Sequence, residues 1–339
     1  MKEHVLITLA DKNFIPQAKQ LFSSAYWNGG WQGDFLLLAH EVPEEDLRWF
    51  REKGIIVFPC KPLSERELIG VRHPPVVLDK FYLFTPFFKQ WKRIVFLDAD
   101  IIVKASLDRL VETKGFCAPN ATCVGLTKEF FRTDRKLRAE LERTYPLRGK
   151  AFNTGVFAFD AADIAGDTFE KMTALYEKFG SLNFYGEEGT FNLFFYKKWT
   201  MLPVMYNAYP TYMRDTYNLG HGRLESAIIH FVGETNAKPW LETSLWHGEW
   251  VENLRKADGI DLLHPQGTAK IWTQKEERDY IRALPAKRLH HLIRRKISTP
   301  AARASRKLWD RIEHMIGQTG LFIKKLFPRL YERIRIKHD

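Results

Sequence analysis

The first hundred residues alternate between short continuous apolar runs and stretches in which apolar residues recur at helical spacing. This pattern predicts strands over residues 5–9, 35–39, 55–58 and 94–97, with helices over 16–26 and 43–53 between them. Regular alternation of strand and helix indicates a mostly parallel sheet that is covered by helices on both faces. We therefore expect a Rossmann-like α/β fold.

The pattern becomes weaker along the rest of the chain. It predicts strands over residues 122–126, 155–159 and 227–232, and helices over 167–179 and 189–197. After Trp250 the periodicity fades, and from Pro285 onward the sequence becomes basic and helical in character. We therefore divide the chain into an α/β domain (1–250), a connecting segment (251–285) and a basic helical tail (286–339).

The composition is that of a folded protein, and the lack of a leader or membrane span leads us to expect that it is made and kept in the cytoplasm. Its 45% hydrophobic and 14% aromatic content can build a sizeable core. No stretch approaches the roughly 18 apolar residues of a membrane span, and the apolar run at 5–7 is too short for a signal peptide. Cys60, Cys117 and Cys123 form no CxxC pair, which favours buried thiols over disulfides or a zinc site.

The net charge of +11 is concentrated in the tail. Residues 286–339 contain fifteen Lys/Arg and four Asp/Glu, so their net charge equals that of the whole chain. Leu289, Leu292 and Ile293 share one helical face among these basic residues, as is typical of helices that lie on anionic lipid. We expect the tail to hold the protein on the inner face of the cytoplasmic membrane. A helical extension packed on the α/β domain is the alternative, and nucleic-acid binding is disfavoured because the apolar face is continuous.

Asp98-Ala99-Asp100 directly follows the predicted strand 94–97, at the edge where open α/β sheets bind ligands. In an extended chain, residues i and i+2 point to the same side, so both carboxylates would face one site. Two carboxylates at such a short distance repel each other unless a cation lies between them. A divalent cation there could also bind a diphosphate. The alternative is a structural pair of turn aspartates, but the apolar residues 101–103 argue against a turn into solvent.

Four segments resemble, in the same order, the glycogenin-like glycosyltransferases of family 8. They are the strand that ends in Asp98-Ala99-Asp100, the segments at residues 8–14 and 152–157, and the segment at 230–233 followed by 238–240. Together they cover roughly residues 5 to 245. The resemblance implies a GT-A fold and a transferase that moves a hexose from a UDP-sugar to a saccharide or lipid-linked saccharide acceptor.

The resemblance also implies a set of donor-binding residues. They are Thr8, Leu9, Ala10, Asp11, Asn13, Phe14, Lys80, Asp98, Ala99, Asp100, Gly233 and Lys238. Asp11 and Asn13 would bind uracil or ribose, while Phe14 would pack on the base. Lys238 would contact the diphosphate as a point charge and Gly233 would do so by close backbone approach.

A metal ion is part of the same expectation. The resemblance implies that it is held by Asp98, Asp100 and His230. Two carboxylates and an imidazole suit Mn²⁺ better than an all-oxygen Mg²⁺ site would, with Mg²⁺ as the alternative. A histidine after a strand is more often structural, so the role of His230 depends on the segment around it.

Asn153, Glu187 and Glu188 are expected at the reacting face. The family pattern has aspartate and glutamine where this chain has Glu187 and Glu188. A carboxylate at Glu188 could stabilise positive charge on the sugar or act as a nucleophile, or the two glutamates could simply begin a helix. Glu129 is a weaker candidate on the acceptor side. The family retains the anomeric configuration, although a carboxylate base could also serve inversion.

The tail and the departure at Glu187-Glu188 leave other functions open. Bacterial family members that extend lipopolysaccharide or capsule chains end in similar basic tails, which suggests a role in cell-surface polysaccharide synthesis. One alternative is a glycogenin-like protein that glycosylates itself. Another is a membrane-associated scaffold that has kept the fold and lost catalysis.

Overall fold

The computed structural model describes residues 2–63, 75–131, 134–210, 226–233, 238–264 and 269–283. The chain separates into two compact units, Met1–Leu284 and Pro285–Asp339. All described residues belong to the first unit, so the predicted tail helices over 286–339 lie outside them. Cys60 and Cys117 are buried free thiols, as expected, whereas the side chain of Cys123 is not among those described.

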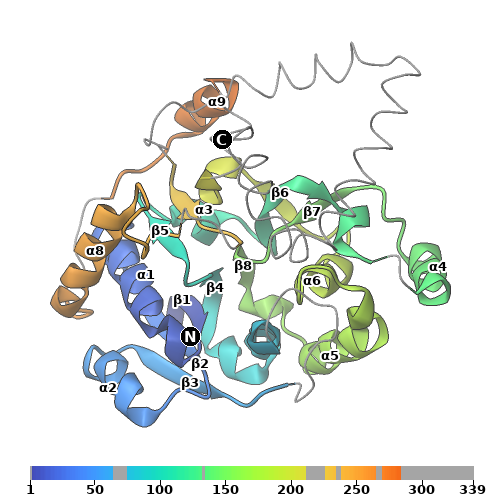
Figure 1. Cartoon of the computed structure of the whole chain (residues 1–339), viewed down its shortest axis with the longest axis horizontal. Helices are drawn as coiled ribbons and strands as arrows, with labels where there is room; N and C mark the ends of the chain where they lie inside the picture. Colours follow the sequence, from blue (N-terminus) through green and yellow to red (C-terminus); the bar gives the residue numbers. More distant parts are fainter. Residues whose placement is uncertain are drawn as a thin grey trace, which may run out of the picture. The chain divides into compact units, whose positions relative to one another are not determined.

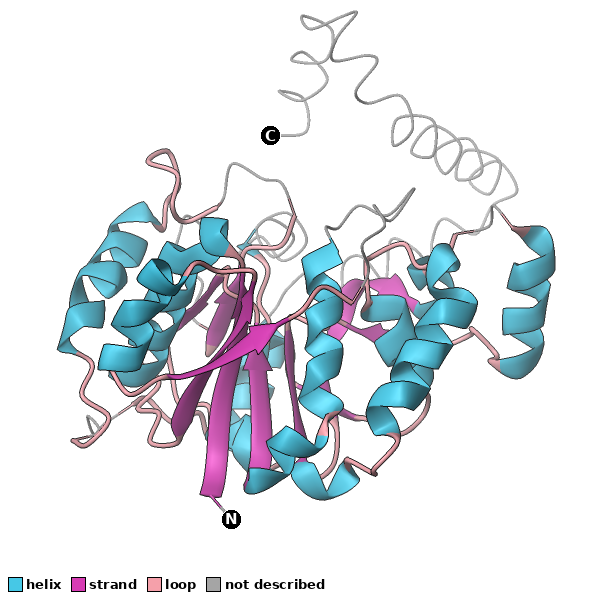
Figure 2. Ribbon diagram, turned by 90° about the horizontal axis from the view of Figure 1, so that it is seen from below, coloured by secondary structure: helices cyan, strands magenta, loops and turns pink. Residues whose placement is uncertain are grey.

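An eight-stranded sheet, counted over the described residues, runs through the centre of the first unit (Figures 1 and 2). Its strands are β1 (Lys2–Ala10), β2 (Asp34–His40), β3 (Ile56–Cys60), β4 (Trp91–Leu97), β6 (Cys117–Gly125), β7 (Lys150–Phe152), β8 (Val156–Asp160) and β9 (Thr200–Leu202). They lie in the order β3-β2-β1-β4-β8-β6-β7, with β9 beside β6. The first four strands are parallel, as the sequence predicted, and the direction changes where β8 pairs antiparallel with β4.

Helices cover both faces of this sheet. They are α1 (Ile15–Trp27), α2 (Glu44–Glu52), α3 (Asp108–Glu112), α4 (Arg135–Thr144), α5 (Thr168–Phe179), α6 (Glu188–Phe194), α8 (His247–Lys256) and α9 (Gln274–Ala283). Figure 1 shows α1, α2 and α8 on one side of the sheet and α5 and α6 on the other. Because successive strand residues face opposite sides, Leu6 packs with Phe22 in one core, and Ile7 belongs to a second core with Phe157 and Phe191.

A small second sheet continues the chain beyond β4. It pairs β5 (Ile101–Val103) antiparallel with β10 (Ile228–His230). The expectation that Asp98-Ala99-Asp100 lies in an extended chain is wrong, because Ala99 and Asp100 form a turn. The turn exists because the chain leaves the main sheet after Leu97 and enters the small sheet at Ile101. All three residues of β5 are buried, so the chain turns into the protein, as its apolar sequence indicated.

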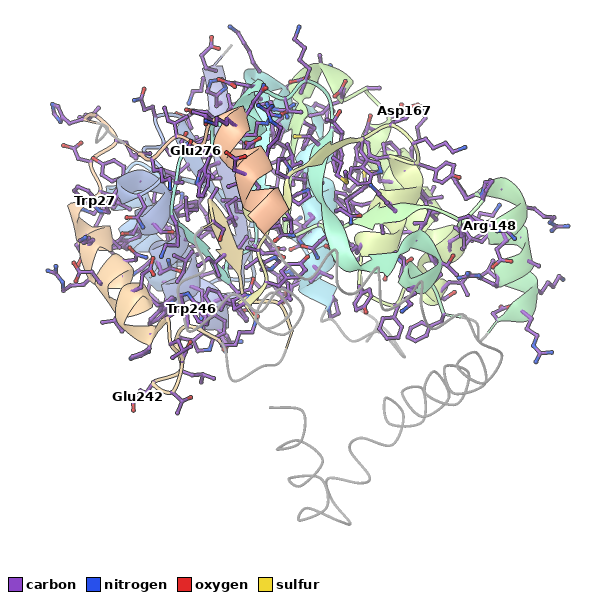
Figure 3. All side chains as sticks on the ribbon, turned by 90° about the horizontal axis from the view of Figure 1, so that it is seen from above. Trp27, Arg148, Asp167, Glu242, Trp246 and Glu276 are labelled. Atoms are coloured by element: carbon purple, nitrogen blue, oxygen red, sulfur yellow. The ribbon has the colours of Figure 1, made fainter. Side chains whose placement is uncertain are left out.

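The described residues of the expected connecting segment (251–285) pack against the rest of the first unit. The hydroxyl of Tyr206 donates to Glu277 of α9 (3.1 Å), and the amide of Ser106 donates to the carbonyl of Lys270 (2.9 Å). The indole of Trp27, at the end of α1, donates to the last carbonyl of α8 (3.1 Å; Figure 3). Among the described helices, none has both the length and the apolar character needed to cross a membrane.

Candidate active site

Asp98, Asp100 and His230 meet beside the turn that links the two sheets. The aspartates come from the turn itself, and the β5–β10 pairing places His230 opposite Ile101. One ligand atom from each of the three side chains lies within 4.8 Å of the others. Nε2 of His230 is 3.1 Å from Oδ1 of Asp100 and 3.7 Å from Oδ2 of Asp98. The structure thus brings together the three residues that the sequence suggested as metal ligands.

The ring of His230 is held from behind by Asn207. Nδ1 of His230 is 2.8 Å from Oδ1 of Asn207, whose amide nitrogen donates to Oδ1 of Asn153 (3.1 Å). Because an amide oxygen can only accept, Nδ1 carries a proton, and Nε2 is the ring nitrogen that faces the two carboxylates. Sequence analysis missed Asn207. The sequence feature that could have indicated it is a single amide residue in the otherwise apolar and aromatic stretch 205–209. This stretch is buried in the structure.

Gly155 lets the backbone pass directly beside these ligands. Its carbonyl accepts from the amide of Asp98 (2.8 Å). A Cβ atom at this position would lie 2.2 Å from Cε1 of His230 and 2.7 Å from Oδ2 of Asp98, which is too close for either. The glycine is therefore required by close approach at the metal site, a requirement that the sequence alone did not reveal.

Two lysines balance the aspartate charges. The buried ammonium of Lys80 is 2.9 Å from Asp98 and 2.8 Å from Glu187. Burial alone would lower the pKa of Lys80, but these two carboxylates outweigh it and raise that pKa above its usual range. Nζ of Lys238 is 2.6 Å from Oδ2 of Asp100. Burial opposes the charge of Asp100 as well, but His230 and Lys238 hold the pKa of this carboxyl well below its usual range.

The three residues expected at the reacting face lie together next to Lys80. Glu187 and Glu188 stand at the start of α6, and both side chains are buried. Oε1 of Glu187 accepts from Lys80 and from the hydroxyl of Thr154 (2.7 Å). Oε2 of Glu188 accepts from the Asn153 amide (2.7 Å) and from the backbone N–H of Thr154 (3.1 Å). Thr154, which sequence analysis did not single out, therefore joins both glutamates.

The expected uridine-binding segment lies at the same edge of the sheet. Thr8, Leu9 and Ala10 end β1, which pairs with β4 up to the partners Ile7 and Phe96. Oδ1 of Asp11 accepts from the amides of Asn13 (2.8 Å) and Phe14 (3.2 Å), so this carboxylate shapes the turn after β1.

Three further residues that were predicted to bind the donor are Phe14, Gly233 and Ala99. The exposed ring of Phe14 packs edge-on against Trp240 at 6.1 Å, which places it near Lys238. Gly233 adopts φ +73°, a conformation that favours glycine, and residues 234–237 after it are outside the described set. Ala99 is buried inside the metal-site turn. Among the described residues, no hydrogen bond or ion pair joins Thr8, Leu9 or Ala10 to Asp98, Asp100 or His230.

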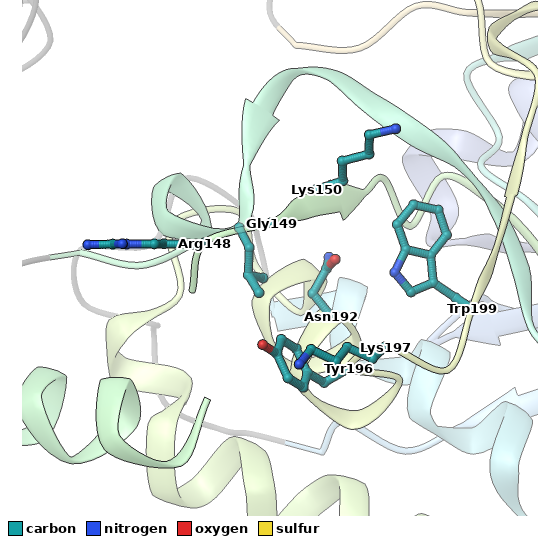
Figure 4. A pocket seen from close by; sticks show the side chains of 8 residues that line it. Arg148, Gly149, Lys150, Asn192, Tyr196, Lys197 and Trp199 are labelled. Atoms are coloured by element: carbon teal, nitrogen blue, oxygen red, sulfur yellow. The ribbon is translucent and has the colours of Figure 1, made fainter. Parts of the chain in front are cut away.

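A separate cavity of about 250 Å³ is lined by Lys150 of β7, by Asn192 of α6 and by residues near them (Figure 4). Its wall includes three basic and two aromatic side chains, those of Arg148, Lys150, Lys197, Tyr196 and Trp199. The amide of Asn192 donates to the carbonyls of Phe152 and Glu188 (both 2.9 Å). None of the residues predicted from the sequence as donor or metal ligands lines this cavity.

A GT-A fold with a carboxylate–histidine site at its sheet edge defines a glycosyltransferase. The sequence profile of glycosyl transferase family 8 matches residues 5–244, and the chain belongs to this family. It is therefore an enzyme that transfers a sugar from a donor to an acceptor. Comparison with curated protein sequences gave no match.

Several solved structures share the fold. LgtC in complex with donor and acceptor sugar analogs is 15% identical with a TM-score of 0.55, covering 80% of this chain and 98% of LgtC. An active-site mutant of LgtC, in which glutamate replaces glutamine, is 17% identical with a TM-score of 0.58, covering 74% of this chain and 95% of LgtC.

Two longer proteins match as well. GlyE of Streptococcus pneumoniae TIGR4 is 19% identical (TM-score 0.54), and the bifunctional glycosyltransferase WbbM is 15% identical (TM-score 0.54). The matches cover 78% and 77% of this chain respectively, but only 63% of GlyE and 52% of WbbM. At these identities the likeness shows a common fold.

Proposed function

We propose that this enzyme transfers a hexose from a UDP-sugar to a saccharide or glycolipid acceptor, with Mn²⁺ as the metal ion. The observation that carries the proposal is the convergence of Asp98, Asp100 and His230, with Lys238 at hydrogen-bond distance from Asp100. Two carboxylates and an imidazole are a suitable ligand set for Mn²⁺. A divalent ion held there would neutralise charge on the diphosphate leaving group.

The residues around the ligands support the binding of a nucleotide diphosphate. Asn207 fixes the tautomer of His230, which leaves Nε2 free to bind a metal. The ammonium of Lys238 also lies over the ring of Trp240, 5.2 Å from its centroid, and in the proposed complex it would exchange its contact with Asp100 for a phosphate oxygen. Phe14, which packs edge-on against Trp240, offers an aromatic surface for a base.

The sugar would lie between the metal site and the glutamates. Asn153 connects the two, because its oxygen accepts from Asn207 and its nitrogen donates to Glu188. Retention of the anomeric configuration is part of our proposal, on the strength of the family resemblance. The configuration of the product, measured by NMR on the transferred sugar, tests it.

Binding of UDP is the direct test of the metal site. We expect calorimetry to show UDP binding that requires Mn²⁺ and that is lost in Asp98→Asn. Asp167→Asn makes the same chemical change at an exposed position and should bind like the wild type. If the wild type binds no UDP with Mn²⁺, the scaffold alternative replaces the enzyme proposed here.

Donor identity can be measured without knowledge of the acceptor. A panel of UDP-sugars, each assayed for slow Mn²⁺-dependent hydrolysis, should yield one preferred hexose. Mass spectrometry of the protein after the same incubation separates the glycogenin-like alternative, because a protein that glycosylates itself gains hexose masses.

We also propose that the basic tail attaches the enzyme to the inner face of the cytoplasmic membrane, where it would extend a lipid-linked cell-surface saccharide. The support is the net charge of residues 286–339, because each basic residue near anionic lipid contributes about 1 kcal/mol. A variant that ends at residue 285 should keep donor hydrolysis and lose binding to anionic vesicles. Vesicle binding by this truncated variant would disprove attachment through the tail.

A further inference from the structure

Three buried glutamates stand close together on the acceptor side of the site, and their hydrogen bonding is very unequal. Glu187 accepts from Lys80 and Thr154. Oε2 of Glu188 accepts from two N–H donors, while no described residue donates to its Oε1. Glu129, which is 0% exposed, has no hydrogen-bond donor on either carboxyl oxygen within the described part of the chain.

A carboxylate without a hydrogen-bond donor is very unfavourable when it is fully buried. The carboxyl group of Glu188 lies beside that of Glu129. Glu187 is the other charged group that acts on Glu129, so both of its charged neighbours are acidic. Burial is the main cause that raises the pKa of Glu129 well above its usual range, and the charge of Glu188 is the second cause. Burial without a donor therefore favours the protonated form of Glu129, and the carboxyl group of Glu188 is an acceptor beside it.

The surroundings of Glu188 also favour its uncharged form. The charged groups that face it are Glu187, which is adjacent in the chain, and Lys80, which is already paired with Glu187 and Asp98. Burial is the main cause that raises the pKa of Glu188 to about 8, with Glu187 acting in the same direction. The donors on Oε2 and the charge of Lys80 oppose this shift without cancelling it.

We propose that Glu129 and Glu188 form a proton-holding pair, so that Glu188 meets the substrate as an uncharged carboxylic acid and not as a carboxylate nucleophile. This inference rests on the proposed transfer reaction. A protonated carboxyl has an O–H donor on one oxygen and an acceptor on the other, so it resembles an amide, which also has donors on one atom and an acceptor on the other. The family pattern has an amide at this position, so the buried acid pair lets a glutamate take over the work of a glutamine.

In this arrangement Glu188 hydrogen-bonds a sugar hydroxyl through Oε1, since Oε2 is occupied by Asn153 and Thr154. Glu129 is a positioning residue, because it acts through Glu188. When Glu188 loses its proton, the O–H of Glu129 can donate to the resulting carboxylate, and the pair never carries two charges. Two adjacent carboxyls of this kind titrate as one unit.

Infrared spectroscopy tests the pair without any need for turnover. At pH 7 the metal-free wild type should show C=O absorption of protonated carboxyl groups, part of which disappears in Glu129→Gln and part in Glu188→Gln. Glu52→Gln, the same change at an exposed glutamate of α2, should leave this absorption unchanged. If the wild type has no such absorption at pH 7, the proposal is wrong even if the enzyme transfers sugar.

The pH dependence of donor turnover tests the role of Glu188. If Glu188 acts as an acid, wild-type turnover should fall above about pH 8, by roughly tenfold per pH unit, and Glu188→Gln should lack this decline. A carboxylate nucleophile predicts the reverse: turnover that rises with pH, and a Glu188→Gln variant that is inactive at every pH. That result would overturn the inference. Protonated carboxyls without any turnover would instead support the pair and count against the proposed function.

Discussion

The two acidic groups that flank Lys80 have opposite surroundings. On one side, Asp98 and Asp100 are partly exposed and lie within 4 Å of a lysine or of His230. On the other side, Glu129 and Glu188 are buried, and neither forms an ion pair with a described residue. Cationic partners surround the carboxyl groups of the first setting, where a metal ion could take their place, whereas the second setting offers no such partner and favours the protonated form. The same functional group thus gives the site a cation-binding half and a proton-holding half.

Lys80 separates these halves, so its replacement should have the largest effect. Lys80→Met leaves the buried Glu187 with only the Thr154 hydroxyl as donor. It also removes the lysine that pairs with Asp98. Removing one partner of a buried ion pair costs about 3–5 kcal/mol, which we expect as the loss in free energy of unfolding by urea titration at pH 7. Lys92→Met, at an exposed pair with Glu3, is the control and should change little. A loss in Lys80→Met no larger than in the control would show that the halves do not depend on this charge.

Gly155→Ala should disturb only the cation-binding half of the site. The added methyl would lie 2.2 Å from the ring of His230, so the ring or the backbone must shift. We expect the Mn²⁺ affinity, measured through UDP binding, to fall by about 10- to 100-fold, with about 1–3 kcal/mol lost in stability. Gly166→Ala adds a methyl where no atom lies within 4 Å and should retain metal binding. Equal affinities in the two variants would remove Gly155 from the metal site.

Asn207→Ala should have a smaller effect on the same half. It removes the acceptor that fixes the tautomer of His230 but leaves all three ligands in place. Changes to such supporting residues typically cost 10- to 100-fold in metal affinity, and we expect about tenfold here. Titration of Mn²⁺ in the presence of UDP measures it. A variant with unchanged affinity would mean that the ring of His230 is oriented by its packing alone.

The fold was predictable from the sequence where local pattern decides it. Strands β1 to β4 and helices α1 and α2 were found because each is an uninterrupted apolar run or a one-sided helix. The metal-site turn was predicted wrongly as extended chain, because the start of a second sheet at Ile101 depends on pairing with β10, far along the chain. Helices α8 and α9 were missed since they bury few side chains and are otherwise polar.

The candidate site divides in the same way. Asp98, Asp100, His230 and the residues around Glu188 were found because they lie in short segments that resemble a family. Gly155, Thr154 and Asn207 act through contacts that only the folded chain creates, so no local pattern marks them. The burial of Glu129, and with it the acid pair, likewise depends on where its strand-like neighbour Phe130 pairs with Asn183.

The last prediction concerns the proton-holding half and how stability changes with pH. Between its ordinary pKa of 4.5 and its raised pKa of about 8, Glu188 is protonated in the folded protein and ionised in the unfolded chain. The folded state then binds more protons, so the free energy of unfolding falls as pH rises through this window and levels off above it, by up to about 1.4 kcal/mol per pH unit for one group. Glu188→Gln cannot ionise and should flatten this slope by about one proton, which urea titrations at pH 5, 6, 7 and 8 would measure. An equal slope in wild type and variant would mean that Glu188 is charged in the folded protein, and the contrast between the two halves of the site would then disappear.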